Sequence, residues 1–369
     1  MSKLEELIQE LCPNGVEYCP LEKVCQITKG VQFNKKDMND EGSYPVINGG
    51  MNPSGYIEQY NQEENTITIS QGGASAGYVN WQETKFWAGA HCYVLYPKRE
   101  LVNRYLFHFI KSREIKLQEC QYGAGIPALA KRTIASLEIP VPPLPVQSEI
   151  VRILDNFTEL TAELTAELTA RKKQYEYYRN ELFERAPNTE KYHLDDISIN
   201  CDNLRKPVTS GNRIAGQYPY YGASGIVDYV NDYIYDGDYL LVSEDGANLL
   251  ARSTPIAFSI SGKNWVNNHA HVLKFDNYAT RRYVEIYLNS IDLSPYISGG
   301  AQPKLNQKNL NKISIPMPSL PEQERIVAIL DRFDTLCNDI SEGLPAEIEA
   351  RQKQYEYYRD QLLTFKKLP

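Results

Sequence analysis

Apolar residues recur every three or four positions along two long stretches of this chain. After Pro145 they fall at positions 150, 153, 157, 160, 164 and 168, and later at 175, 178 and 182. The second stretch repeats the pattern at 326, 329, 333, 336 and 340, and later at 355, 358 and 362. This spacing predicts two long helices that pair through a coiled-coil seam. Gly343 and Pro345 interrupt the second stretch, so we expect a kink or a break there.

Short β patterns fill the sequence before each long helix. TITIS (66–70), HCYVLYP (91–97) and YLLVS (239–243) are rich in apolar and β-branched residues, as strands are. Helical patterns follow around NRYLFHFIKS and RRYVEIYLNS, and the connecting segments are rich in Gly, Asn and Ser. The sequence therefore predicts two globular regions of the α+β class.

The chain is an internal repeat. IPVPPLPVQSEIVRILDNFTEL at 139–160 matches IPMPSLPEQERIVAILDRFDTL at 315–336, and RKKQYEYYR at 171–179 matches RQKQYEYYR at 351–359. Because neither helix can bury its seam alone, mutual pairing is the simplest solution. A pseudo-twofold relation between the copies then predicts two long antiparallel α-helices that separate the globular regions.

The repeat also sets the expected domain organisation. We expect an N-terminal helix at 1–11, a first globular region at 12–144 and a first helical spacer at 145–186. The second globular region is expected at 187–319 and the second helical spacer at 320–369. Near-perfect TAEL tetrads between residues 158 and 170 fall inside the first spacer.

Composition and charge narrow the function classes. The 369 residues carry a formal net charge of -8. Residues 12–144 hold 13 basic and 13 acidic side chains, and residues 187–320 hold 12 and 13. The excess of negative charge therefore lies mainly in the predicted helices. Because phosphate neutralisation supplies much of DNA affinity, such a chain needs cationic surface from a partner to bind DNA well. The seven scattered cysteines form no CxxC pair, so we expect free thiols and no metal site. The sequence shows neither a signal peptide nor a membrane span, so a cytoplasmic protein is expected.

At the paired I-P-x-P-x-L-P-x-Q connectors, the QKQYEYYRD string and the TAEL tetrads, the chain resembles the specificity subunit of type I restriction-modification systems. The resemblance implies two target recognition domains that each read one half of a bipartite DNA site. It also implies partners: double-stranded DNA, two methyltransferase subunits and, in the complete enzyme, restriction subunits. S-adenosylmethionine, ATP and Mg²⁺ are then expected on those partner subunits, with no cofactor and no catalysis in this chain.

The sequence contains none of the motifs of those catalytic activities. It has no GxxxxGK[ST] loop for ATP and no GxGxxG after a strand, and Asn52-Pro53 continues with Ser-Gly rather than Pro-aromatic. Two alternatives remain open on the residues alone. One is a noncatalytic coiled-coil adaptor without DNA specificity, and the other is a self-contained methyltransferase or nuclease.

Candidate DNA-binding residues are polar side chains in the irregular loops, because Gln and Asn suit adenine, Arg and Lys suit guanine, and Asp and Glu accept from cytosine. In the first globular region they are Lys29, Gln32, Asn34, Lys35, Gln71, Ser75, Lys131 and Arg132. In the second they are Arg205, Lys206, Arg213, Glu244, Asp245, Asn248, Arg252, Lys304, Asn306 and Lys308. For the seam and partner docking the candidates are Leu160, Leu164, Leu168, Tyr175, Tyr178, Leu182, Ile340, Tyr355, Tyr358 and Leu362.

Overall fold

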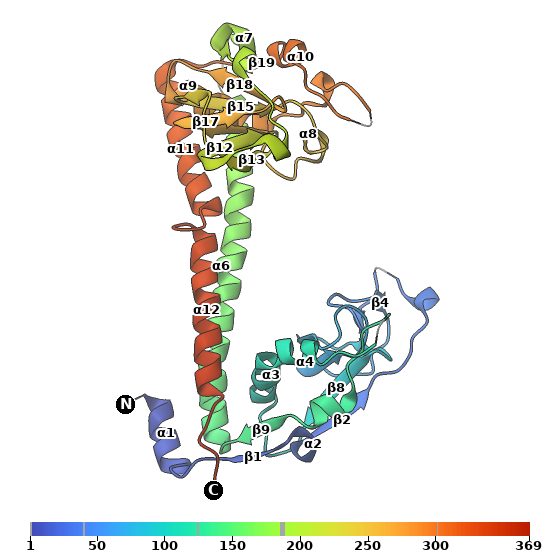
Figure 1. Cartoon of the computed structure of the whole chain (residues 1–369). Coiled ribbons are helices and arrows are strands. Elements are labelled where there is room, and N and C mark those ends of the chain that lie inside the picture. The colour runs from blue at the N-terminus through green and yellow to red at the C-terminus, as the bar shows by residue number, and fades with distance from the viewer. Residues whose placement is uncertain (1, 40, 124, 185–188, 301) are drawn as a thin grey trace. The chain divides into compact units, whose positions relative to one another are not determined.

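The computed structural model describes residues 2–39, 41–123, 125–184, 189–300 and 302–369 (Figure 1). These residues divide into two compact units. Unit 1 is Met1–Ala166 with Ala346–Pro369, and unit 2 is Glu167–Pro345. Each unit therefore combines one globular region with segments of the long helices. The predicted domain boundaries stay a prediction, and the one between 186 and 187 lies outside the described residues.

Unit 1 contains a four-stranded antiparallel sheet and a smaller three-stranded sheet. The larger sheet has the order β2-β8-β5-β6, with β2 (Cys25–Lys29), β8 (Cys92–Pro97), β5 (Thr66–Ser70) and β6 (Val79–Gln82). The smaller has the order β4-β3-β7, with β4 (Tyr56–Ile57), β3 (Tyr44–Ile47) and β7 (Trp87–Ala88). A separate pair joins β1 (Glu17–Pro20) to β9 (Glu138–Val141). The helical elements are α1 (Lys3–Leu11), α2 (Leu21–Val24), η1 (Lys35–Asp37), α3 (Asn103–Ser112), α4 (Glu114–Glu119) and α5 (Lys131–Ala135).

Unit 2 repeats this plan. Its first sheet has the order β11-β18-β15-β16, with β11 (Ile199–Asn200), β18 (Ala270–Lys274), β15 (Tyr239–Ser243) and β16 (Ala257–Ile260). Its second has the order β13-β12-β17-β14, with β13 (Gly225–Val230), β12 (Ala215–Gly222), β17 (Lys263–Val266) and β14 (Tyr235–Asp236). Strand β10 (Lys191–His193) pairs with β19 (Ser314–Pro316), as β1 does with β9. The helical elements of the globular region are α7 (Leu194–Ile197), η2 (Asp202–Leu204), η3 (Ser210–Asn212), α8 (Asn248–Ala251), α9 (Tyr278–Ser290), η4 (Ser294–Tyr296) and α10 (Gln307–Asn311). The α+β class and the internal repeat are confirmed.

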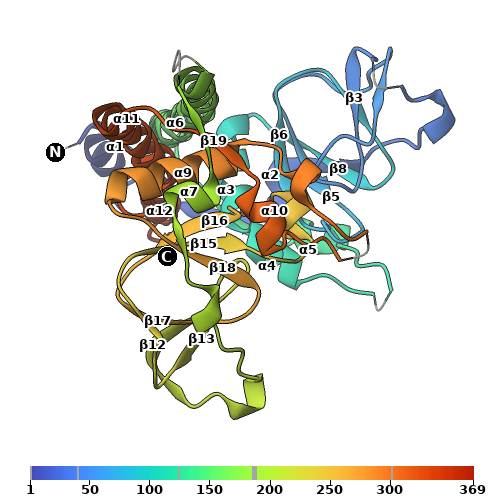
Figure 2. The same ribbon diagram turned by 90° about the horizontal axis from the view of Figure 1, so that it is seen from above.

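The central strands β5 and β15 are buried along their whole length, because both faces of the sheet are covered. Successive side chains of a strand point to opposite faces of the sheet. In β8, Tyr93 and Leu95 enter the large core of unit 1, whereas Cys92 and Val94 enter a small core on the other face. In unit 2, α9 lies along β15 and β16 and covers the first sheet (Figure 2).

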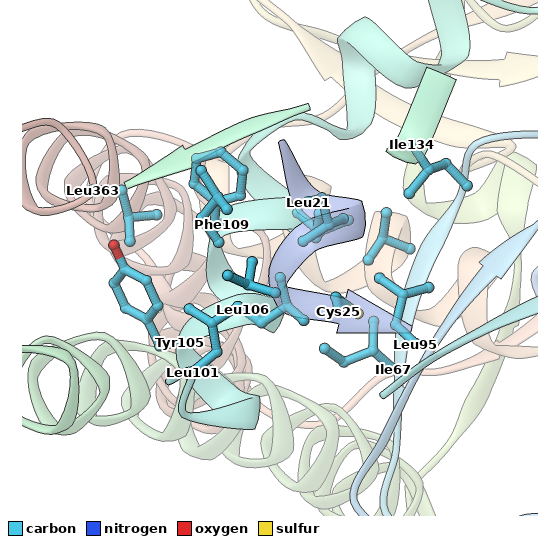
Figure 3. Packing of buried hydrophobic residues seen from close by; sticks show 14 of the residues in the cluster. Leu21, Cys25, Ile67, Leu95, Leu101, Tyr105, Leu106, Phe109, Ile134 and Leu363 are labelled. Carbon is cyan, nitrogen blue, oxygen red and sulfur yellow. The ribbon is translucent and has the colours of Figure 1, made fainter. Parts of the chain in front are cut away.

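The main core of unit 1 joins the sheet to the helices. Leu21 from α2, Ile67 from β5 and Leu106 from α3 reach this core, and all three are fully or almost fully buried (Figure 3). Ile150 and Leu154 of the long helix belong to the same cluster. The globular region and its helices therefore share one hydrophobic core.

The first long helix is α6 (Leu144–Glu184), and the second stretch forms α11 (Leu320–Asn338) and α12 (Leu344–Leu362). In unit 1, α12 runs beside the first part of α6 in the opposite direction, and Phe157 stacks on Tyr358 with ring centroids 5.5 Å apart (Figure 1). In unit 2, the rings of Tyr175 and Tyr178 of α6 pack against the ring of Phe333 of α11. Their ring centroids lie 6.4 and 6.0 Å from that of Phe333. The helix pairing is thus confirmed inside each unit, although Leu160 is 37% exposed and Leu164 and Leu168 are only half-buried.

The predicted break in the second helix is confirmed, and one seam assignment is wrong. Residues between Asn338 and Leu344 leave the helix, and the Asp339 carboxylate accepts hydrogen bonds from the backbone of Ser341 and Glu342. A Cβ at Gly343 would lie 2.5 Å from the Thr335 carbonyl oxygen. Ile340 lies in this break and is 81% exposed, so it does not extend the seam. The apolar spacing reaches Ile340, but the helix ends at Asn338.

Within the described ranges, no helix is both long and apolar enough to cross a membrane.

Candidate nucleic-acid interface

Three loops of unit 1 meet at the start of β8. The Gly30 amide donates to the carbonyl oxygen of Cys92 at 2.9 Å, and the Gln71 amide donates to that of His91 at 2.8 Å. The Leu129 amide in turn donates to the Gln71 carbonyl at 2.7 Å. Backbone hydrogen bonds therefore bring three segments to one edge of the sheet: 29–35, which begins at the end of β2, 71–75, and 127–132, which leads into α5. These are the loops in which the sequence predicted DNA-binding residues.

Most of the predicted side chains in these loops face solvent. Gln71 and Ser75 are half-buried, and the Gln71 Oε1 atom is buried without a hydrogen-bond partner among the described residues. The exposed ones are Lys29, Gln32, Asn34, Lys35, Lys131 and Arg132. Solvated cations and amides at a sheet edge are suited to phosphate and base contacts. Their individual roles stay a prediction.

Unit 2 repeats two of these three backbone hydrogen bonds. The Glu244 amide donates to the His269 carbonyl at 2.9 Å, and the Leu305 amide donates to the Glu244 carbonyl at 2.7 Å. Glu244 thus takes the place of Gln71, and His269 takes the place of His91. The two histidines therefore have matching backbone roles in the scaffold that the two units share.

The chemistry of the second loop set is different, because it is ionic. Arg205 contacts Glu244 at 2.5 Å and Asp202 at 3.2 Å, and Lys304 contacts Glu244 at 3.1 Å. Burial tends to raise the pKa of Glu244, but Arg205, His271 and Lys304 outweigh it and hold that pKa below its usual range. The carboxylate is therefore ionised at neutral pH and joins three loops through its charge.

A histidine completes this network. His271 is buried, with Nδ1 2.6 Å from Asp202 and Nε2 2.8 Å from the Leu305 carbonyl oxygen. In unit 1 the hydroxyl of Tyr93 donates to the equivalent Leu129 carbonyl at 3.0 Å. Neither Asp202 nor His271 is among the DNA-binding residues that the sequence predicts. The two units thus present a neutral and a charged version of the same loop frame.

Several predicted residues of unit 2 are engaged in holding its loops. Arg252 adopts a left-handed backbone conformation and donates to the Ile291 carbonyl at 2.5 Å, at the end of α9. Arg213 pairs with Asp228 at 3.2 Å. The other contacts are those of Asn248 with Thr254, Asp245 with His269, and Asn306 with the amide of Asn309 at the start of α10. Lys206 and Lys308 are exposed. Base recognition by any of these residues stays a prediction.

The helices of unit 2 carry an open groove. It has a volume of about 570 Å³ and is lined by Tyr177, Tyr178, Glu181, Leu182, Glu322, Arg325, Ile329 and Phe333. Glu149, the repeat counterpart of Arg325, has a side chain only 4% exposed, and it pairs with Lys3 of α1 at 3.2 Å. The Arg325 side chain is 53% exposed. Helix α1 therefore packs against a helix face in unit 1 whose counterpart in unit 2 is open.

Among the residues that the structure describes, no group of three or more His, Cys, Asp or Glu side chains could hold a metal ion.

Known proteins are similar to this chain in sequence and in fold. A family model described as the type I restriction modification DNA specificity domain matches residues 13–171 and 188–350. A putative type I restriction enzyme specificity subunit of Haemophilus influenzae is 34% identical over 98% of both chains. The EcoR124I/EcoR124II specificity subunit of Escherichia coli is 30% identical over 100% of this chain and 98% of its own length.

Solved structures agree on the fold. The crystal structure of a type I restriction-modification S subunit from M. genitalium superposes with a TM-score of 0.67 over 99% of both chains, at 20% identity. The family model occurs twice, once in each copy of the internal repeat, as expected for two recognition domains. The chain belongs to the family of type I restriction-modification DNA specificity subunits.

Proposed function

We propose that each globular region is a target recognition domain that reads one half of a bipartite, asymmetric DNA site. The long helices set the unspecified spacer between the half-sites and dock the methyltransferase subunits. One observation carries this proposal. The same loop frame holds a neutral side chain, Gln71, in one unit and a charged network around Glu244 in the other. Two copies of one scaffold with different loop chemistry are what two different half-sites require.

Helix geometry supports the spacer role. One tetrad adds about 6 Å of helix and turns its end by roughly 40°. A base pair rises about 3.4 Å along the duplex, so one tetrad corresponds to one or two base pairs. The second long stretch, α11 and α12, is interrupted by non-helical residues between Asn338 and Leu344. Because extended chain spans roughly 3.3 Å per residue, this interruption can extend when a tetrad lengthens α6.

The matched tyrosine strings support docking of two identical methyltransferase subunits, to which restriction subunits add in the complete enzyme. Tyr177 is 59% exposed beside the groove of unit 2, and its counterpart Tyr357 is 62% exposed. Exposed tyrosines at matched positions are typical of protein interfaces. Tyr177→Ala is then expected to weaken capture of the methyltransferase subunit, whereas Tyr192→Ala, a tyrosine on β10 outside this surface, is expected not to.

In this proposal the chain itself is noncatalytic. S-adenosylmethionine is bound by the methyltransferase subunits, and ATP with Mg²⁺ by the restriction subunits. The purified chain alone is then expected to show no methyl transfer and no DNA cleavage.

Methylome sequencing tests the proposal. The wild-type chain and a variant with residues 161–164 duplicated are each expressed with the methyltransferase subunit. We expect both half-site sequences to persist while the gap between them grows by about one to two base pairs. Altered half-sites with an unchanged gap would contradict the spacer role.

A gel shift separates this function from that of an adaptor. Bipartite DNA taken from the methylome is mixed with the chain, with and without the methyltransferase subunit. We expect sequence-specific binding when both subunits are present. Equal binding to scrambled DNA in both lanes would favour a protein-binding adaptor.

A further inference from the structure

Both units fasten their globular region to their long helix with the same pair of polar contacts. The first contact is a buried glutamine at the start of the helix. Gln147 of α6 accepts a hydrogen bond from the Val102 amide at 2.8 Å, and it donates to the carbonyl oxygens of Glu100 and Pro142. In unit 2, Gln323 of α11 accepts from the Thr280 hydroxyl at 2.8 Å and donates to the Pro318 carbonyl. Both glutamines are buried.

The second contact is an ion pair two helical turns further along. Arg104 of α3 donates from Nε to Asp155 of α6 at 2.8 Å, and its guanidinium lies over the ring of Trp81. Arg282 of α9 donates from Nε to Asp331 of α11 at 2.7 Å. Arg104 and Arg282 occupy matching positions of the repeat, as do Asp155 and Asp331. All four side chains are no more than 30% exposed.

Additional partners strengthen each ion pair. In unit 1, His108 Nε2 lies 2.8 Å from Asp155 and its Nδ1 lies 3.1 Å from the hydroxyl of Tyr355 on α12. In unit 2, Arg282 also contacts Asp334 at 2.7 Å, and the Tyr278 hydroxyl donates to Asp331 at 2.9 Å. Each globular region is therefore held to its helix at two points on one helix face. Two separated points resist rotation as well as sliding.

We propose that Arg104 with Asp155, and Arg282 with Asp331, are positioning residues that restrict the enzyme to one spacer length. This inference rests on the proposed function. A half-site displaced by one base pair lies about 3.4 Å away and is rotated by roughly 35° about the DNA axis. A recognition domain reaches this displaced half-site only if the contacts between the domain and its helix, which we call the joint, allow the domain to move. Without the guanidinium the carboxylate loses its charged partner. The glutamine contact and the shared hydrophobic core remain, but the second point of contact is weakened, so the domain turns more easily.

The test is methylome sequencing of the chain expressed with the methyltransferase subunit. Arg104→Ala and Arg282→Ala are compared with Arg332→Ala, which removes an exposed arginine next to Asp331 in the sequence. We expect both joint variants to keep both half-site sequences. Methylation at spacings one base pair longer or shorter should rise about tenfold, as expected for loss of a part-buried, charge-assisted hydrogen bond. Arg332→Ala should keep the wild-type spacing.

The outcomes are distinct. A joint variant that methylates both half-sites at the wild-type spacing alone overturns the inference. If Arg104→Ala abolishes methylation, Asp155→Asn decides, because it removes the charge of the carboxylate with little change in size, and retention of a single spacing by this variant overturns the inference too. A wild-type methylome with one uninterrupted motif would instead refute the proposed function.

Discussion

Substituting Gln147 by leucine tests how much one buried amide stabilises unit 1. The side chain is 0% exposed and makes three hydrogen bonds, to the Val102 amide and to the carbonyl oxygens of Glu100 and Pro142. Leucine has nearly the same size but cannot make these bonds. All three backbone groups then lose this partner inside the protein.

The expected cost follows from those three groups. Each buried polar group without a partner costs about 1–3 kcal/mol. Burial of the leucine side chain returns roughly 1–2 kcal/mol. The net loss is therefore roughly 1–8 kcal/mol. For a unit of this size, a loss of about 3 kcal/mol within that range lowers the midpoint of thermal unfolding by roughly 6–12 °C.

The assay is thermal unfolding of the purified chain, followed by circular dichroism. Gln323→Leu in unit 2 serves as a graded comparison, because that side chain makes two hydrogen bonds rather than three. Gln354→Leu, at an exposed position of α12, serves as the control. If Gln147→Leu unfolds at the same temperature as Gln354→Leu, the three hydrogen bonds of Gln147 do not stabilise unit 1.

Three further predictions concern single residues. Burial holds the pKa of His108 below its ordinary value of 6.5, although Asp155 opposes this shift. As pH falls, the unfolded chain therefore protonates His108 before the folded chain does, and stability declines below about pH 6.5. In urea unfolding measured between about pH 5 and 7, His108→Gln should show a smaller decline. Gly343→Ala should lower stability by roughly 1–3 kcal/mol in urea unfolding, because its Cβ would meet the Thr335 carbonyl; an unchanged midpoint would contradict this packing. Ile340→Ser should change stability by less than about 0.5 kcal/mol in the same assay, since the side chain is exposed, and a larger loss would restore Ile340 to the seam.

Local patterns predicted most of the architecture. The repeat at an offset of 176 residues placed two matching connectors, and both lead into helices that begin at Leu144 and Leu320. Strand segments such as TITIS and YLLVS became the central strands β5 and β15. These predictions succeeded because side-chain periodicity and proline geometry act over a few neighbouring residues.

Predictions that depended on distant partners were weaker. Arg252 is a predicted DNA-binding residue, and nothing in the sequence indicates that its guanidinium donates to the Ile291 carbonyl at the end of α9. Ile340 fitted the heptad spacing, yet the helix ends before it. A spacing pattern cannot show which backbone carbonyl, here 39 residues away in the sequence, accepts a hydrogen bond from an arginine.

The sequence by itself determined the internal repeat, the α+β class, the long helices and the family. Only the tertiary structure decided which polar side chains are used internally, such as Arg205 with Glu244 and Arg104 with Asp155. It also decided that α1 covers a helix face in unit 1 whose counterpart in unit 2 stays open. The physical reason is that a polar side chain pairs with whichever group the fold brings within about 3 Å, and that group is often far away in the sequence.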